Sequence, residues 1–308
     1  MPDDPSMPVE TSQRPEPQRA PRSRALRGPI LVAIDEAGPA EGALHLADLL
    51  ARRDRVNAHL LGAAPPVAFP LALVLPAEYE AVEEARRQQL LTRVRQQLNR
   101  ALGLAAYWST EAAIGPLATV AARSCQARGT ALVVVGIPEP GAPDRTARED
   151  AALQVVRAVE VPVLIVPPRY DRLPQHALVA MDFSDASRRA ARTALAVLGP
   201  DPMVTLAHVQ PDVDFAALGK PGWEAIYARG LDALVREVAD ELRSAGDVTV
   251  DTVVRRGDVV TTLLALARER GCDLIAAGTQ GGTPLERHLV GSVSTATLRG
   301  ARSAVLIA

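Results

Sequence analysis

The residues best suited to chemistry lie near the C-terminus of this 308-residue chain, in two short glycine motifs separated by nine residues. The first is Gly-Thr-Gln-Gly at 278–281 and the second is Gly-Ser at 291–292. Glycines leave backbone N–H groups open to close approach, and the second motif is placed to begin a helix. A helix N-terminus offers free amides and a positive dipole end to an anion. The spacing therefore predicts a site for the phosphates of a nucleotide.

This site is not a P-loop. The chain contains no Gly-x-x-x-x-Gly-Lys-Ser/Thr motif, and its single lysine, Lys220, is far from both glycine motifs in the sequence. We therefore expect the nucleotide to be held without a P-loop lysine.

The segment that positions these motifs is one of two copies of the same module. Each copy opens with an apolar strand that ends in a carboxylate, Pro29–Asp35 and His176–Asp182, and a second apolar strand follows in each, Val56–Leu61 and Val204–Val209. The C-terminal thirds of the copies align without a gap at an offset of 142 residues. A period this long indicates an internal duplication that produces tandem domains.

The apolar pattern of each copy predicts alternating strands and helices. Continuous apolar runs such as Leu132–Gly136, Val163–Val166 and Leu274–Gly278 are typical of parallel strands buried on both faces. The fold class is therefore α/β, with two tandem doubly wound, Rossmann-like domains, each built on a five-stranded parallel sheet. One helix of each copy carries an apolar stripe at helical spacing. The two stripes are Val82, Leu90, Leu91, Val94 and Leu98, and Leu231, Leu234, Val235, Val238 and Leu242.

Composition sets the domain boundaries that we expect. Residues 1–27 are rich in Pro, Ser, Arg, Asp and Glu and have few large apolar side chains, which predicts a disordered tail. The first domain then covers residues 28–167, a stiff proline-containing linker covers 168–175, and the second domain covers 176–308.

Charge and residue usage exclude several classes of function. A formal net charge of −2 and an aromatic content of 3% give no reason to expect a nucleic-acid partner. Two cysteines form neither a disulfide framework nor a metal-ligand set, which fits a reducing cytoplasm. No apolar run reaches the roughly 18 residues that a membrane span needs. We therefore expect a soluble cytoplasmic protein.

The second module resembles the nucleotide-binding branch of the universal stress protein family. The family's Gly-x-x-Gly, nine residues, Gly-Ser/Thr pattern stands here at 278–292, its opening strand and Asp at Leu178–Asp182, and its second-strand ending at His208-Val209. The resemblance covers nearly everything after the tail, as two tandem modules. It implies an ATP-binding protein of stress response or signalling that holds its nucleotide in the second domain.

The resemblance also implies roles for individual residues. Asp182 and Val209 would hold the adenosine end, and Ala180 and Gly278 would lie against the ribose. The phosphates would be held by Gly281, Gly291, Ser292 and Val293. Independently of the resemblance, Ser294 and Thr295 follow Gly291-Ser292 directly and are expected to add hydroxyls to the same helical turn. The full expected cofactor-binding set is Ala180, Met181, Asp182, Val209, Ala277, Gly278, Gly281, Gly291, Ser292 and Val293.

One position departs from the family pattern. The residue after Gly281 is commonly Arg in the family and is Gly282 here, so the charge of a triphosphate would rest on Arg287, His288 or backbone amides. We expect ATP, with AMP or ADP as alternatives and Mg²⁺ only together with the nucleotide.

The first module lacks the phosphate motifs. At the offset of 142, carboxylates replace three expected phosphate contacts: Glu139, Glu149 and Asp150 stand for Gly281, Gly291 and Ser292. Like charges about 4 Å apart repel by roughly 1 kcal/mol in water and more in a partly desolvated crevice. We therefore expect the first domain not to bind a nucleotide phosphate tail and to act as a structural or regulatory partner.

Structural explanations compete with these assignments. Each glycine alone is explained by a turn or cap, whereas the full set with Asp182 and Ser292 favours binding. Asp35 is explained by a helix N-cap. We place His59 and His208 at the ends of the second strands, where both suit a buried crevice edge better than catalysis.

The sequence favours a non-enzymatic function. No motif supplies a positioned base and metal ligands beside the phosphates, so a slow ATPase or a nucleotide-dependent transferase is an alternative, as is a nucleotide-free interaction scaffold. The apolar last strands, Val163–Val166 and Val305–Ala308, have edges that invite pairing. The resemblance implies that they meet between the two domains of one chain, and a homodimer is a further expectation.

Overall fold

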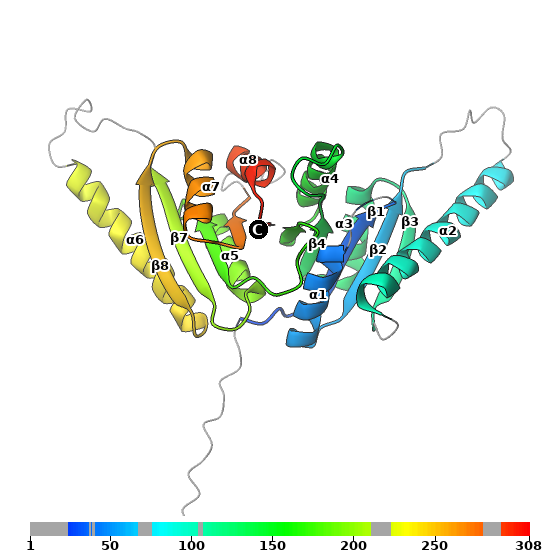
Figure 1. Ribbon diagram of the computed structural model, residues 1–308, viewed down its shortest axis with the longest axis horizontal. Coiled ribbons are helices and arrows are strands. Elements are labelled where there is room, and N and C mark those ends of the chain that lie inside the picture. The colour runs from blue at the N-terminus through cyan, green and yellow to red at the C-terminus, as the bar shows by residue number, and fades with distance from the viewer. Residues whose placement is uncertain are drawn as a thin grey trace, which may run out of the picture.

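The computed structural model describes residues 24–36, 38, 41–66, 76–103, 107–210, 223–279 and 291–308, and shows two halves of similar design (Figure 1). Strands and helices alternate in both halves, as the sequence predicts. The elements of the first half are β1 (Ile30–Asp35), α1 (Glu41–Asp54), β2 (Ala58–Ala64), α2 (Pro76–Leu102), β3 (Ser109–Ile114), α3 (Leu117–Arg128), β4 (Leu132–Gly136), α4 (Arg145–Ala158) and β5 (Val163–Val166).

The second half repeats this order after the linker. Its elements are β6 (His176–Ala180), α5 (Asp185–Val197), β7 (Met203–Gln210), α6 (Trp223–Ala245), β8 (Thr249–Arg256), α7 (Val259–Glu269), β9 (Leu274–Ala277), α8 (Ser292–Gly300) and β10 (Ala304–Ile307).

The ten strands of the described residues belong to one sheet, in the order β3-β2-β1-β4-β5-β10-β9-β6-β7-β8. The pairs within each half are parallel. The halves join through β5 and β10, which are antiparallel, with Leu164 opposite Leu306. Each half is therefore a five-stranded, doubly wound domain, and the apolar sheet is continuous across the domain boundary.

The helices cover both faces of the sheet. Helices α1, α2, α5 and α6 contribute to the hydrophobic core on one face, and α3, α4, α7 and α8 contribute to the core on the other. Successive strand residues alternate between these cores, with Val32 in the first and Leu31 in the second, both fully buried. Strands covered on two faces need apolar residues at every position, which explains the continuous apolar runs in the sequence.

The predicted helix stripes are only partly buried. Val82 of α2 and Leu234 of α6 are 41% and 38% exposed, whereas Val94 and Val238 on the same helices are buried. These helices contact the sheet mainly through their later turns, so helical spacing alone overestimated how much of each stripe is covered.

The chain packs against the core before residue 28 and at several positions of the linker. Leu26, expected in the tail, is buried, and its amide donates to Asp54 Oδ2 at 3.0 Å. In the linker, Tyr170 donates its hydroxyl to the Asp273 carbonyl and accepts from the Ala304 amide at 3.1 Å, and burial raises the pKa of Tyr170 to about 12. Residues 1–23 of the expected tail lie outside the described part of the chain.

Candidate functional site

A cavity of about 250 Å³ lies in the second domain, at the C-terminal ends of β6, β7 and β9 and the first turn of α8. Nine of the ten residues that the sequence analysis singled out line it, and the tenth, Gly281, lies outside the described residues. The nine are Ala180, Met181, Asp182, Val209, Ala277, Gly278, Gly291, Ser292 and Val293. Segments that are far apart in the sequence therefore converge on one cavity.

The same cavity is also lined by residues that were not predicted to be there from the sequence. Val259 and Leu263 come from α7 and add apolar surface, while Ser187 comes from the first turn of α5. Ala207 and Thr279 complete this group. The position of α7 after β8 was a usable signal, because a helix that follows a strand in a doubly wound domain begins beside the crevice.

Asp182 is held in an ionised state by its own loop. Its Oδ1 accepts hydrogen bonds from the Ser184 amide at 3.0 Å and the Ser184 hydroxyl at 2.6 Å. Partial burial opposes ionisation, but the hydrogen bonds from Ser184 and Ser187 outweigh it, so the pKa of Asp182 lies below its usual value. The next residue, Phe183, has a φ of 63°, a left-handed conformation that non-glycine residues rarely adopt.

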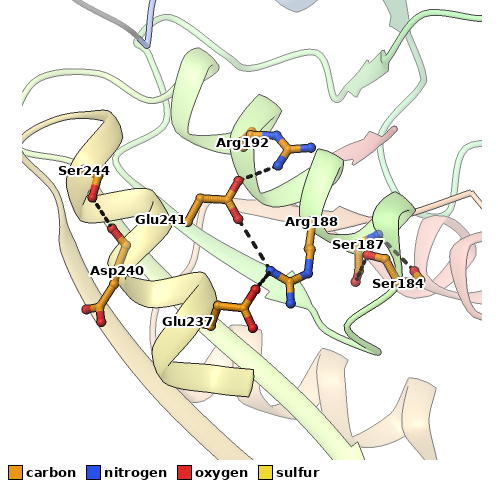
Figure 2. A network of polar contacts seen from close by, with 8 residues as sticks. All are labelled: Ser184, Ser187, Arg188, Arg192, Glu237, Asp240, Glu241 and Ser244. Carbon is orange, nitrogen blue, oxygen red and sulfur yellow. Dashed lines mark hydrogen bonds and ion pairs between the residues drawn. The ribbon is translucent and has the colours of Figure 1, made fainter. Parts of the chain in front are cut away.

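Helix α5 is fixed at its N-terminus and along the side that faces α6. Ser184 is the N-cap and accepts from the Ser187 amide at 3.2 Å. One turn further on, Arg188 lies between Glu237 and Glu241 of α6, at 2.9 and 3.6 Å (Figure 2). The cap and the ion pairs together hold the cavity-facing end of α5.

Gly278 has a packing role as well as a place in the cavity. A Cβ atom there would lie 2.7 Å from the Ala186 carbonyl carbon and 2.8 Å from the Ser187 nitrogen, both backbone atoms of α5. Any side chain would push α5 away from the end of β9. The glycine is therefore required for this close approach, whatever it contacts in a ligand.

Helix α8 begins beside the cavity without a side-chain cap. Its N-cap is Gly291, with φ −58° and ψ 152°, and this residue has no side chain that could bond the first amides. The first amides of a helix have no intrahelical acceptor, so Ser292 and Val293 can donate to an anion. Ser294 differs from the expectation, because it is buried and its hydroxyl donates to the Gly278 carbonyl at 2.8 Å. It fastens α8 to β9.

His208 stands at the cavity edge and has a defined tautomer. Its Nδ1 is 2.7 Å from the Met181 carbonyl, an acceptor, so Nδ1 carries a proton. Its Nε2 is 3.3 Å from the Tyr227 hydroxyl, and the ring lies 5.1 Å from that of Phe183. These contacts make His208 a support for the loop after β6.

The expected position of His59 at the end of its strand is wrong, because His59 is the second residue of β2, whereas His208 lies near the end of β7. Ala33, two residues before Asp35, pairs with Leu61, whereas Ala180, two residues before Asp182, pairs with Ala207. The counterpart of His208 is therefore Gly62, where a Cβ would lie 2.3 Å from Val94 of α2. Helix α2 packs directly on that glycine, and the sequence similarity around the histidines hid the shift in register.

The arrangement matches a known family. The model of the universal stress protein family matches residues 27–167 and again residues 174–308. The chain belongs to the universal stress protein family. A universal stress protein of Methanocaldococcus jannaschii is 31% identical over 138 residues, which are 42% of this chain and 79% of that protein.

Solved structures show the same tandem fold. A universal stress protein from Archaeoglobus fulgidus matches with a TM-score of 0.60 at 18% identity, covering 93% of this chain and 97% of that one. A Pseudomonas aeruginosa protein described as functionally unknown matches with a TM-score of 0.58 at 18% identity, covering 92% and 93%. Within the described residues of this universal stress protein, no helix has the length and apolarity needed to cross a membrane.

The corresponding crevice of the first universal stress domain is filled by an ion pair. Arg148 of α4 contacts Asp35 at the end of β1 through Nη1, and its Nε lies 3.2 Å from Asp144. The cavity that remains between the strand ends and α4 measures about 10 Å³. Asp35 therefore has an arginine as a partner, where its counterpart Asp182 is bonded by serines.

The three carboxylates of the first domain bond elsewhere than expected. Glu149 is buried against Arg145 at 2.6 Å, Asp150 pairs with Arg299 of the second domain at 2.9 Å, and Glu139 lies 3.6 Å from Arg169. Helix α4 already begins at Arg145, so positions 149 and 150 lie inside the helix, where α8 has its N-cap and first residue. Repulsion by free carboxylates is thus not the main difference. The first domain has no open helix N-terminus at this position.

Proposed function

We propose that this universal stress protein binds one adenine nucleotide in its C-terminal domain, with ATP as the expected ligand. The bound nucleotide would set the conformation or partner choice of the protein in stress response or signalling. The observation that carries the proposal is the convergence of nine sequence-selected residues on one cavity beside the open end of α8.

The lining of the cavity suits the parts of a nucleotide. Val209, Val259 and Leu263 offer apolar surface to a base, and the ionised Asp182 can accept hydrogen bonds from ribose hydroxyls or the base. The first turn of α8 offers amides to phosphate. The volume of about 250 Å³ lies slightly below the usual range for small-molecule sites, roughly 300–1,000 Å³.

A nucleotide-sensing role is favoured over catalysis. Within the described part of the chain, the polar groups at the cavity are one carboxylate, hydroxyls, backbone amides and the His208 imidazole. The His208 Nδ1 donates to the Met181 carbonyl and its Nε2 lies 3.3 Å from the Tyr227 hydroxyl, so the ring supports the loop after β6 and is not offered to a ligand as a positioned base. Among the described residues, no group of three His, Cys, Asp or Glu side chains could hold a metal ion. Magnesium would therefore enter with the nucleotide.

Equilibrium titration with labelled ATP tests the proposal. We expect saturable binding with one site per chain, competed by unlabelled AMP and ADP. No saturable binding by intact protein would eliminate nucleotide sensing and favour the interaction scaffold. Product analysis after long incubation separates sensing from hydrolysis, because sensing leaves the bound ATP intact.

A further inference from the structure

Two arginines of the N-terminal domain bond the C-terminal ends of two helices in the other domain. Arg53, in the last turn of α1, donates from Nη1 to the Leu198 carbonyl at 2.6 Å and from Nη2 to the Ala196 carbonyl. Arg145, the first residue of α4, donates from Nη2 to the Ala301 carbonyl at 3.2 Å. Leu198 and Ala301 are the C-caps of α5 and α8. Both arginines therefore bond carbonyls that a helix end leaves without an intrahelical donor.

The opposite ends of the same two helices form walls of the candidate site. Ser187, in the first turn of α5, and Ser292, the first residue of α8, both line the cavity. A cation at the C-terminal end of a helix stabilises the negative end of its dipole and holds its last carbonyls in place. The N-terminal domain thus bonds the C-terminal ends of α5 and α8, the two helices whose N-terminal ends line the cavity.

Both arginine contacts are anchored in partly buried positions. The Arg53 side chain is 20% exposed, and its Nε donates to Asp54 at 2.7 Å. The Arg145 side chain is 10% exposed, and its Nε donates to Glu149 at 2.6 Å. A guanidinium bonded to a neighbouring carboxylate is held in one orientation, so its remaining N–H groups point at fixed acceptors.

The arrangement differs between the two domains at α5. Helix α1 carries Arg52 and Arg53 in its last turn, whereas α5 carries no basic residue in its last turn. Helix α5 therefore receives the cation at its C-terminal end from the other domain.

We propose that Arg53 and Arg145 are positioning residues of the nucleotide site in the other domain. The N-terminal domain then serves the site by holding α5 and α8 in line with the cavity. This inference rests on the proposed nucleotide binding.

Titration of full-length variants with ATP and with adenosine tests the role of Arg53. Arg53→Ala is expected to weaken ATP binding about three- to tenfold, the size of a helix-end charge effect in a partly buried position. The matched control is Arg52→Ala, which removes the neighbouring arginine, whose ion pair with Asp48 stays within α1. It is expected to bind like the wild type. Arg53→Lys keeps the charge next to Asp54 but not the planar fork, and its affinity should be intermediate.

A double variant that neutralises both members of the buried Arg145–Glu149 pair tests the Arg145 contact. The double variant Arg145→Gln, Glu149→Gln avoids leaving one buried charge without its partner. It should weaken ATP binding about three- to tenfold and leave adenosine binding unchanged, because α8 faces the phosphates. The control is Asp150→Asn, which removes an exposed ion pair between the same two helices and should bind both ligands like the wild type.

The failures of the two proposals can be told apart. If the wild type binds ATP and both arginine variants bind it equally well, the positioning role is overturned and nucleotide binding stands. If the wild type shows no saturable ATP binding, both are overturned. An equal loss of ATP and adenosine binding by the Arg145 double variant, with a lowered melting temperature, reports general destabilisation and also overturns the positioning role.

Discussion

The two domains share a fold, but the equivalent crevice is open in the C-terminal domain and nearly filled in the N-terminal domain. In the C-terminal domain the strand ends and the open first turn of α8 border a cavity of about 250 Å³. In the N-terminal domain Arg148 contacts Asp35, and about 10 Å³ remains. Helix α4 begins before the position that caps α8, so its amides there are used within the helix. The two crevices therefore differ in where one helix begins, although the order of the five strands in each half of the sheet is the same.

The largest expected effect comes from giving the C-terminal site a residue of the N-terminal one. Gly291→Glu should weaken ATP binding about 100-fold or more, because a carboxylate at the N-cap of α8 repels phosphate in a partly desolvated site. The backbone at Gly291, with φ −58° and ψ 152°, accepts any residue, so the fold should be kept. Calorimetric titration measures the affinity, with Gly291→Ala as the control. Wild-type affinity in the Glu variant would show that the phosphates lie elsewhere.

A second variant tests the packing role of Gly278 at the end of β9. Gly278→Ala should lower the free energy of unfolding by about 1–3 kcal/mol, because its Cβ would press on the backbone of α5. Gly230→Ala in α6 is the matched control, since a Cβ there meets nothing within 4 Å. It should stabilise the protein by about 0.4–1 kcal/mol. Urea unfolding followed by circular dichroism measures both, and equal stability of the two variants would refute the close contact.

The ion pair in the N-terminal crevice gives a smaller expected effect. Arg148→Ala leaves Asp35 without this cation and should destabilise the protein by about 1 kcal/mol. The stoichiometry of ATP binding should remain one per chain, because removing Arg148 does not shorten α4. A second bound nucleotide in the variant would show that the arginine alone closes the site. Arg192→Ala, which breaks an exposed ion pair to Glu241, is the control and should change stability by well under 1 kcal/mol.

The smallest expected effect is the pH dependence of stability at Asp182. The pKa of this group is lowered in the folded protein, so its ionisation stabilises the fold above its unfolded pKa, about 3.8, and the contribution is lost as the pH falls through the folded pKa. Below pH 4 the stability of the wild type should therefore fall more steeply than that of Asp182→Asn. Denaturant unfolding at pH 5 and pH 3 provides the comparison. Parallel changes in the two proteins would contradict the hydrogen-bonded carboxylate.

Much of the fold follows from patterns that the sequence carries directly. Continuous apolar runs and a repeat at constant spacing are local signals, and the βα alternation they predict is confirmed. The strand ends must share one edge of a parallel sheet, which is why Asp182, Val209 and Gly278 could be placed near one another before the structure.

The predictions from the sequence failed where a feature depends on packing between neighbouring elements. The position of His59 was wrong because the bounds and the pairing register of β2 depend on neighbouring strands and are not visible in one strand. The role of Arg148 was missed because a helix boundary moved by less than two turns changes which side chain reaches the crevice. The contacts of Arg53 and Arg145 connect the two domains, and no local sequence pattern predicts them.

The β5–β10 joint has a consequence for synthesis of the chain. Strand β5 is made in the middle of translation, but its partner on one side is β10, near the end of the sequence. Until β10 leaves the ribosome, the nascent first domain presents a bare edge of Val163–Val166, which are all buried in the finished protein. Such an edge can pair with other chains. Truncation before residue 304 should therefore leave this edge exposed and yield aggregates.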